Sequence, residues 1–408
     1  MYLRCIDEGC ATKLELHQRA LACPRCGGLL ELAAGPLMFN PQVLKDLWWN
    51  RRCSRDPRDR SGVWRFREFL PEYAPREIVT MGEGNVPLVA GIKSGDWAGL
   101  ADIRFKHLGW NPTGCFKDLG MTVGVTEAKF QGVRTVACAS TGNTAGSMTA
   151  YAARAGMTAR VYLPAGAVSL NKVAQALDYG AEIIEVEGSF DQALETLLHE
   201  AGPDVYFLNS INPFRIEGQK TVMFELLEEM AWNPPDYIVV PGGNLGNTSA
   251  FGKALHELKT AGLIDKVPRL IVVQAEGANP LVRTWRAGPD ELLVVKEPHT
   301  AATAIRIGAP VSWKKALKAL RFTNGLAIDV TDDEIAEAKS VIGRDGIGCE
   351  PASAATLAGA RKLVRDGTLQ RGASVVAILT GHVLKDTDYI GKSRYTRAAR
   401  SRAEVQAD

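Results

Sequence analysis

The chain has 408 residues, a length that predicts two or three domains. With 46% hydrophobic and 23% charged residues, its composition excludes a disordered or collagen-like protein. A formal net charge of only +2 argues against a nucleic-acid or acidic-membrane partner. We find neither an apolar run of about 18 residues nor a signal-peptide pattern, so we expect a cytoplasmic protein.

Four of the eight cysteines lie close to the N-terminus and follow a C-x4-C-x12-C-x2-C pattern: Cys5, Cys10, Cys23 and Cys26. Thiols stay reduced in the cytosol, where paired spacings favour metal over disulfide. The segment resembles a zinc ribbon, in which two turns supply a tetrahedral thiolate site. Four protein ligands leave no open position, so we expect one structural zinc. Unpaired thiols, or a ribbon that has lost its metal, are the alternative.

Residues 35–87 are expected to be irregular and to pack against later domains, because they combine three tryptophans, Trp48, Trp49 and Trp64, with several prolines. The arginines between positions 51 and 67 are interpreted as a solvated surface.

From about residue 133 onward, short apolar runs alternate with helical patterns near 144–155, 170–179 and 189–201. The runs are rich in β-branched residues, which suits parallel strands covered on both faces. This alternation predicts an α/β fold with ligands at the carboxyl ends of the strands. The polar tail, residues 393–408, is expected to fray. The predicted strands are VRTVACA, TARVYL, AEIIEVE, DVYFLN, YIVVP, RLIVVQAE and SVVAILT.

Three turns contain candidate catalytic or ligand-binding residues. The first, NPTGCFKDLG at 111–120, places Lys117 at the start of a predicted helix. Burial there would keep the amine neutral part of the time, as Schiff-base chemistry requires. A surface charge is the ordinary alternative for a lone lysine after a turn.

The other two turns are typical of anion sites. STGNT at 140–144 follows a predicted strand and offers backbone N–H groups and short hydroxyls to a carboxylate or phosphate. PGGNLGN at 241–247 follows another strand, and its glycines allow close approach to a phosphate. Helix capping and a plain tight turn are the respective alternatives. Neither turn is a dinucleotide or Walker motif.

Together, six motifs between residues 82 and 386 resemble those of threonine synthases, pyridoxal-phosphate (PLP) enzymes of fold type II. FKDLG and PGGNLGN look more like the plant-type branch, whereas Cys115 stands where the family usually has Ser. The motifs, in order, are NPTGCFKDLG, CASTGNTAGS, NSINPFRIEGQKT, PGGNLGN, NGLAIDVT and ILTGH.

The resemblance implies a tryptophan-synthase-β-like, two-domain α/β architecture after the ribbon-like segment at 1–34. It implies a large PLP-binding domain, 35–116 with 208–392, and a small α/β domain, 117–207. The family also suggests a homodimer, and its plant members are activated by S-adenosylmethionine.

Site roles follow from the same resemblance. Lys117 would carry PLP as a Schiff base and then act as the proton shuttle, Asn143 would contact the cofactor phenolate oxygen, and Thr380 the pyridine nitrogen. The cofactor phosphate would lie against Gly243, Asn244, Leu245, Gly246 and Asn247. The substrate would be held by Ser140, Thr141, Thr144, Asn209, Ser210 and Arg215.

The implied reaction converts O-phospho-L-homoserine and water to L-threonine and phosphate by γ-elimination and β-addition of water. Arg215 would bind the substrate phosphate through its guanidinium fork. The alternative is that Arg215 caps the preceding loop or pairs with Glu217 on the surface. Related PLP enzymes, namely cysteate synthases or serine and threonine dehydratases, are the alternative for the whole chain.

Overall fold

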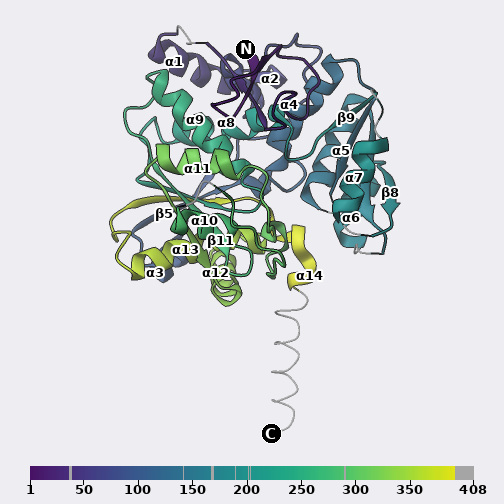
Figure 1. The fold of residues 1–408 in the computed structure, drawn as a ribbon. Coiled ribbons are helices and arrows are strands. Elements are labelled where there is room, and N and C mark those ends of the chain that lie inside the picture. Colours follow the sequence, from purple (N-terminus) through teal and green to yellow (C-terminus); the bar gives the residue numbers. More distant parts are fainter. Residues whose placement is uncertain are drawn as a thin grey trace.

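The structure is a computed structural model that describes residues 1–35, 39–140, 142–166, 170–188, 190–200, 202, 204–288 and 291–390. Within these residues the strands form three sheets, of three, six and four strands. Figure 1 shows the four-stranded sheet with α5, α6 and α7 on the right, beside the larger body that contains the six-stranded sheet. The predicted tail at 393–408 lies outside the described residues.

The smallest sheet lies at the N-terminus and is antiparallel, with the order β2-β1-β3. Its strands are β1 (Tyr2–Cys5), β2 (Lys13–Leu14) and β3 (Leu30–Ala33). Leu3 and Leu32 are buried in the largest core of the molecule. The cysteine-bearing segment is therefore packed against the body of the protein.

The segment after this sheet contains more regular structure than we expected. Helix α1 (Pro41–Arg52) begins where the Asn40 side chain accepts hydrogen bonds from the N–H groups of Gln42 and Val43. Asn at the N-cap followed by Pro is a strong start signal, so the prediction of an irregular segment was wrong here. The segment continues with α2 (Pro57–Arg60) and the 3₁₀ helix η1 (Trp64–Phe69).

The prediction that the nearby arginines are solvated was also wrong in part. Arg65 is 1% exposed and lies 3.0 Å from the carboxylate of Glu228. Arg51 is mostly buried and lies 2.5 Å from Glu68. A buried guanidinium needs such partners because desolvation of the charge is costly. Arg65 thus links the segment 39–87 to helix α8, whereas Arg51 joins α1 to η1 within the segment.

The six-stranded sheet has the order β12-β11-β10-β13-β5-β4, and only β4 is antiparallel to its neighbour. Residues that alternate along β10 and β11 enter two different cores, one on each face of the sheet. This explains the unbroken apolar runs, since parallel strands are covered on both sides. The strands are β4 (Leu88–Ala90), β5 (Asp102–His107), β10 (Tyr237–Pro241), β11 (Arg269–Ala275), β12 (Leu326–Val330) and β13 (Ser374–Leu379).

Helices cover both faces of this sheet (Figure 1). One face carries α8 (Pro213–Glu229), α9 (Gly246–Thr260) and α11 (Trp313–Phe322). The other carries α3 (Ile92–Ala98), α12 (Asp332–Arg344) and α13 (Pro351–Arg365). Short elements complete the body: η2 (Leu108–Trp110), α10 (Pro280–Ala287), η3 (Thr303–Ile305), η4 (Val383–Asp386) and α14 (Thr387–Ile390).

The four-stranded sheet is parallel throughout and has the order β8-β7-β6-β9. Helix α4 (Lys117–Phe130) packs against both α5 and α8, and thus lies between the two larger sheets. The predicted α/β architecture is confirmed, with two larger sheets. The elements are β6 (Thr135–Ala139), α5 (Asn143–Ala155), β7 (Thr158–Pro164), α6 (Leu170–Asp178), β8 (Glu182–Val186), α7 (Phe190–Glu200) and β9 (Val205–Phe207).

The three candidate turns and Thr380 all follow or adjoin carboxyl ends of strands. Ser140 follows β6, the glycine turn follows β10, and Thr380 follows β13. Such ends are where parallel sheets present ligand-binding loops. In the described residues, no helix is long and apolar enough to cross a membrane.

Candidate active site

Lys117 lies at the first position of α4, beside the end of strand β13. The N–H of Phe116 donates to the carbonyl of Thr380 at 3.0 Å, and Cys115 forms an isolated β-bridge with Gly381. Burial, and then the positive charge of Arg215, lowers the pKa of Lys117 to about 7. A large fraction of the amine is therefore neutral near neutral pH, which fits a nucleophile or a base.

Asp118 holds the turn that precedes Lys117. Its buried carboxylate accepts hydrogen bonds from the N–H and hydroxyl of Thr113, at 2.7 and 2.5 Å, and from the hydroxyl of Ser147 at 2.5 Å. Ser147 belongs to α5, so this carboxylate fixes the lysine turn to the helix that starts at Asn143. Burial raises the pKa of Asp118 to about 6.

The first turn of α5 brings Asn143 beside the lysine turn. Its Nδ2 donates to a carboxylate oxygen of Glu350 at 3.0 Å, and its carbonyl lies 3.8 Å from the thiol of Cys115. Burial raises the pKa of that thiol to about 11, so Cys115 is a neutral packing group. Ser140 and Thr144 flank this turn, whereas Thr141 lies outside the described residues.

Glu350, which sequence reasoning missed, joins Asn143 to Thr380. It is 4% exposed, and one of its oxygens accepts a hydrogen bond from the Thr380 hydroxyl at 2.8 Å. Ser353 lies on the other side of Thr380, with the two hydroxyl oxygens 3.0 Å apart. The only sequence signal was a Glu-Pro pair at the start of a helix of small residues.

The glycine turn after β10 forms a close-fitting backbone nest. A Cβ on Gly242 would lie 2.7 Å from Val272, and one on Gly243 would lie 3.1 Å from the carbonyl of Ala304. Leu245 adopts the left-handed conformation with φ of 63°. The side chain of Asn244 bonds to the hydroxyl of Ser210 and to the N–H of Val311, both at 3.3 Å.

This nest has the donors that a phosphate requires. Among the described residues, no acceptor is found for the backbone N–H groups of 243–248. The buried hydroxyl of Thr248 likewise has no partner in the described part of the chain. These groups lie at the start of α9, where the helix dipole favours an anion. The nest therefore fits a cofactor phosphate, and Thr248 extends the predicted set.

Arg215 is a second anion-binding candidate on α8. It is 3% exposed, donates to the carbonyl of Leu208 at 3.0 Å, and leaves its Nε without a partner among the described residues. Glu217 instead contacts Lys220 and Lys253, so a surface pair of Arg215 with Glu217 is wrong. Burial lowers the pKa of Arg215 to about 10, where it is still charged at neutral pH.

The loop after β9 connects Arg215 to the other turns. Asn209 accepts a hydrogen bond from the N–H of Ala139 at 3.2 Å, next to the STGNT turn. Ser210 accepts one from Asn244 of the glycine nest. Lys117, Asn143, Thr380, Arg215 and the nest thus belong to one region. In the described part of the chain, no hydrogen bond joins Ser140 or Thr144 to these groups.

The four N-terminal cysteines form a separate cluster. Their sulfur atoms all lie within 4.8 Å of one another. The Cys5 and Cys26 sulfurs are 3.5 Å apart, and those of Cys10 and Cys23 are 3.6 Å apart. A tetrahedron with Zn–S bonds of about 2.3 Å has edges of about 3.8 Å. The cluster therefore has dimensions that fit a tetrathiolate zinc site.

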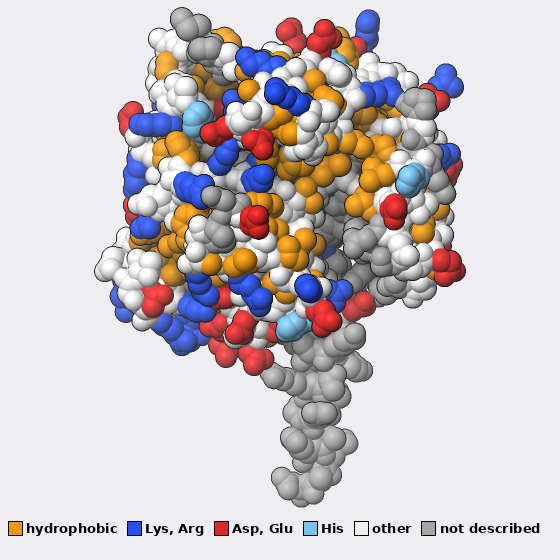
Figure 2. Space-filling model, in the orientation of Figure 1, with side chains coloured by type: hydrophobic (Ala, Val, Ile, Leu, Met, Phe, Trp, Pro, Cys, Tyr) orange, Lys and Arg blue, Asp and Glu red, His pale blue; other side chains and the backbone are white. Residues whose placement is uncertain are grey.

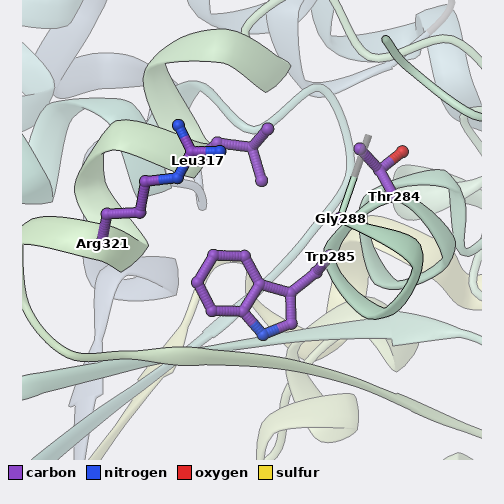
Figure 3. Close-up of a pocket in the computed structure, with 5 residues that line it drawn as sticks. All are labelled: Thr284, Trp285, Gly288, Leu317 and Arg321. Atoms are coloured by element: carbon purple, nitrogen blue, oxygen red, sulfur yellow. The ribbon is translucent and has the colours of Figure 1, made fainter. Parts of the chain in front are cut away.

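A pocket of about 200 Å³ lies between α10 and α11, lined by Thr284, Trp285, Gly288, Leu317 and Arg321 (Figure 3). None of the lining residues belongs to the turns described above. This pocket is therefore distinct from the candidate active site.

Comparison with known proteins agrees with this geometry. Residues 79–381 match the family model described as pyridoxal-phosphate dependent enzyme. The chain is 44% identical to a threonine synthase of Methanocaldococcus jannaschii, over 95% of this chain and 94% of the relative. It is 43% identical to that of Methanosarcina acetivorans, over 94% and 92%. The chain belongs to the threonine synthase family.

A further threonine synthase matches most of the chain, and two solved structures share its fold. The threonine synthase of Mycobacterium tuberculosis is 44% identical over 79% of this chain and 88% of the relative. The structure of the Escherichia coli threonine synthase has a TM-score of 0.70 at 17% identity, covering 96% of this chain and 91% of that chain. Maize serine racemase has a TM-score of 0.63 at 22% identity, over 77% and 94%. These two structural likenesses concern the fold.

Proposed function

We propose that this PLP-dependent threonine synthase converts O-phospho-L-homoserine and water to L-threonine and phosphate. The observation that carries the proposal is that Lys117 and Arg215 lie close together at the site. An amine whose pKa is lowered to about 7 lies near a buried guanidinium whose Nε has no partner among the described residues. The first provides a base, and the second a site for the substrate phosphate.

Two anion sites support a substrate that carries its own phosphate. The glycine nest at the start of α9 would hold the cofactor phosphate through its backbone N–H groups and Thr248. Arg215, Asn209 and Ser210 would hold the substrate phosphate. The substrate carboxylate or phosphate would also meet Ser140, Thr141 and Thr144, at the start of α5.

The cofactor, when bound, supplies an electron sink for the negative charge left by proton removal. Lys117 would hold the cofactor, with Asn143 at its phenolate oxygen and Thr380 at the pyridine nitrogen. Once the substrate amine replaces it, the Lys117 amine would move protons at the α-, β- and γ-carbons. Arg215 would bind the phosphate that leaves the γ-carbon, after which water adds at the β-carbon.

One assay tests this function. The purified holoenzyme is incubated with O-phosphohomoserine, and inorganic phosphate and threonine are both measured. We expect equal amounts of the two products, and no turnover in Lys117→Ala. Phosphate release with a keto acid in place of threonine would identify a dehydratase instead. The same experiment with O-phosphoserine and sulfite tests for cysteate formation.

We also propose a structural zinc bound by Cys5, Cys10, Cys23 and Cys26. The sulfur separations support it, and four protein ligands leave no position for substrate. The zinc would stabilise the ribbon-like segment at 1–34 and would take no part in the chemistry.

The remaining proposals concern the whole chain. The division into a ribbon-like segment, a large domain (35–116 and 208–392) and a small domain (117–207) is supported by the three sheets.

Family resemblance supports a homodimer, and FKDLG and PGGNLGN support a place nearer the plant-type branch. A cytoplasmic location fits the lack of a membrane-spanning helix in the described residues. On the face shown in Figure 2, acidic and basic side chains are interspersed.

A further inference from the structure

Gln219 is a buried residue on α8 that the proposed mechanism leaves unused. It is 3% exposed, and its Oε1 has no hydrogen-bond partner among the described residues. Burying a polar atom without a partner is destabilising, so such atoms are rare in native proteins. An unmatched atom beside a binding site therefore indicates that a ligand completes its bonding.

The amide of Gln219 lies between helix α4 and the glycine nest. A Cβ on Gly120, in the first turn after Lys117, would lie 3.1 Å from the Nε2 of Gln219. A Cβ on Gly246, the first residue of α9, would lie 3.4 Å from the Oε1. Because both neighbours are glycines, the amide reaches from the start of the lysine helix to the start of α9.

The start of α9 contains two further buried side chains with unmatched polar atoms. Oδ1 of Asn247 and the hydroxyl of Thr248 have no partner in the part of the chain that the structure describes. Two amides, one hydroxyl and the backbone N–H groups of the nest can all donate hydrogen bonds. The helix dipole favours an anion at this place, and a phosphate has several acceptor oxygens. One phosphate could therefore accept from all of these groups.

We propose that Gln219 is a further cofactor-binding residue, which donates from its Nε2 to the phosphate of PLP. The inference rests on the proposed function, because it takes the glycine nest as the site of the cofactor phosphate. The oxygen and nitrogen of an amide have nearly the same shape, so a half-turn about the last side-chain bond exchanges them. Oε1 has no bond to lose in the described residues, and the half-turn brings Nε2 to the side of Gly246.

Helix α8 would then provide a donor for each of the two phosphates. Gln219 follows Arg215 by four positions, so the two side chains leave the same face of α8, about 6 Å apart along its axis. The Gln219 amide adjoins Gly246 of the nest, whereas the Arg215 guanidinium donates to the carbonyl of Leu208 after β9. The neutral amide thus faces the cofactor phosphate, and the cation remains for the substrate phosphate.

The test compares the affinity of the apoenzyme for PLP with its affinity for pyridoxal, which lacks the phosphate. Gln219→Met keeps the length of the side chain and removes its donors. We expect this variant to bind PLP about 10- to 100-fold more weakly, because a hydrogen bond to a charged group is lost, and to bind pyridoxal as the parent does. Gln219→Glu should weaken PLP binding further, since a carboxylate repels the phosphate. Gln370→Met, in an exposed turn, is the control and should match the parent.

The outcomes separate a phosphate contact from a structural role. An equal loss of affinity for PLP and pyridoxal would overturn the inference, because it would show that Gln219 only supports the fold. Unchanged PLP affinity would also overturn it, and a higher KM for O-phosphohomoserine in that case would assign Gln219 to the substrate phosphate. If Gln219→Met does not fold, Gln219→Asn withdraws the amide by one methylene and is judged by the same outcomes.

The same measurements distinguish this inference from the proposed function. A parent apoenzyme that binds PLP no more tightly than pyridoxal would overturn the nest as the site of the cofactor phosphate. Failure of the parent holoenzyme to form threonine would overturn the proposed reaction but leave the comparison of the two cofactors intact. A parent that prefers PLP and a Gln219→Met variant with the same preference would overturn only the role of Gln219.

Discussion

The surroundings of Lys117 lower the pKa of its amine. An exposed lysine titrates near pH 10.4 and is almost fully charged at neutral pH. Burial, assisted by Arg215, lowers its pKa to about 7. The amine is neutral above that pH and protonated below it. We therefore predict that the rate at which apoenzyme captures PLP rises with pH up to about 7 and then levels off.

The measurement is the growth of the visible absorption after mixing apoenzyme with PLP across a pH series. Lys117→Ala should still bind PLP through the glycine nest but show no covalent attachment. A capture rate that continues to rise to about pH 10 would mean that the amine is an ordinary lysine.

Arg215 is a buried cation whose Nε has no partner among the described residues. Such a group is costly unless an anion completes its bonding. We predict that Arg215→Ala lowers kcat/KM for O-phosphohomoserine by about 100-fold, corresponding to about 3 kcal/mol for a lost charge-assisted contact. Cofactor occupancy should stay near normal, because the cofactor phosphate has its own nest.

Steady-state kinetics and cofactor absorbance check this prediction together. Arg160→Ala is the matched control, because Arg160 forms an exposed pair with Glu182 on the four-stranded sheet. The control should retain full activity. An active Arg215→Ala would remove Arg215 from the substrate site, and a variant that loses the cofactor would assign it to the cofactor instead.

The sequence predicted the site residues that lie within continuous turn motifs. It did not predict those that reach the site only through the tertiary fold. Lys117 and the glycine nest were predicted because their motifs are continuous. Glu350 meets Asn143 across 207 positions, so no local pattern could indicate the contact. Thr248 was missed because its sequence neighbours do not show that its buried hydroxyl lacks a partner in the part of the chain that the structure describes.

At the scale of elements, apolar runs predicted the buried strands well, whereas β5, in which charged residues alternate with apolar ones, was missed. Strand β5 includes Lys106, which is fully buried because it pairs with Glu225 and Glu229 at 2.7 and 2.8 Å. From the sequence alone, a lysine at this position predicts an exposed strand. Its acidic partners are more than 100 positions away, so no local pattern indicates that it is buried. Helix α1 was missed for a different reason, since its apolar stripe is weak and its start signal at Asn40 was overlooked.

The ribbon-like segment packs on α4 far from the catalytic end of that helix. His17 lies 3.0 Å from the buried carboxylate of Glu127, whereas Lys117 is ten positions earlier, or about 15 Å along the helix axis. We predict about one zinc per chain, and its loss in Cys23→Ser together with a lower unfolding temperature. The turnover number should change little.

Metal analysis measures the zinc content, thermal unfolding measures the stability, and the threonine assay measures the turnover number. Cys53→Ser, which changes an exposed cysteine outside the cluster, should keep its zinc. A parent protein that is metal-free, stable and fully active would contradict the zinc proposal.

At the scale of the whole molecule, side chains join the two larger sheets around the candidate site. Asn143 meets Glu350, and Ser210 meets Asn244. A third link lies at the edge, where Lys385 donates to Gln175 of α6 at 2.5 Å. Gln175 in turn donates to the carbonyl of Thr113, in the lysine turn, at 3.1 Å. The Gln175 side chain therefore links α6 to the body through two hydrogen bonds.

We predict that Gln175→Ala frees α6 without unfolding the protein. The lost bonds contribute about 1 kcal/mol each, so local opening should increase by roughly tenfold or more. Hydrogen exchange of residues 170–178 should quicken accordingly, while the global unfolding temperature stays close to that of the parent. Gln370→Ala, which removes a bond within one exposed turn, is the control and should leave this exchange unchanged. Unaltered exchange in Gln175→Ala would mean that apolar packing, and not this polar link, holds α6 in place.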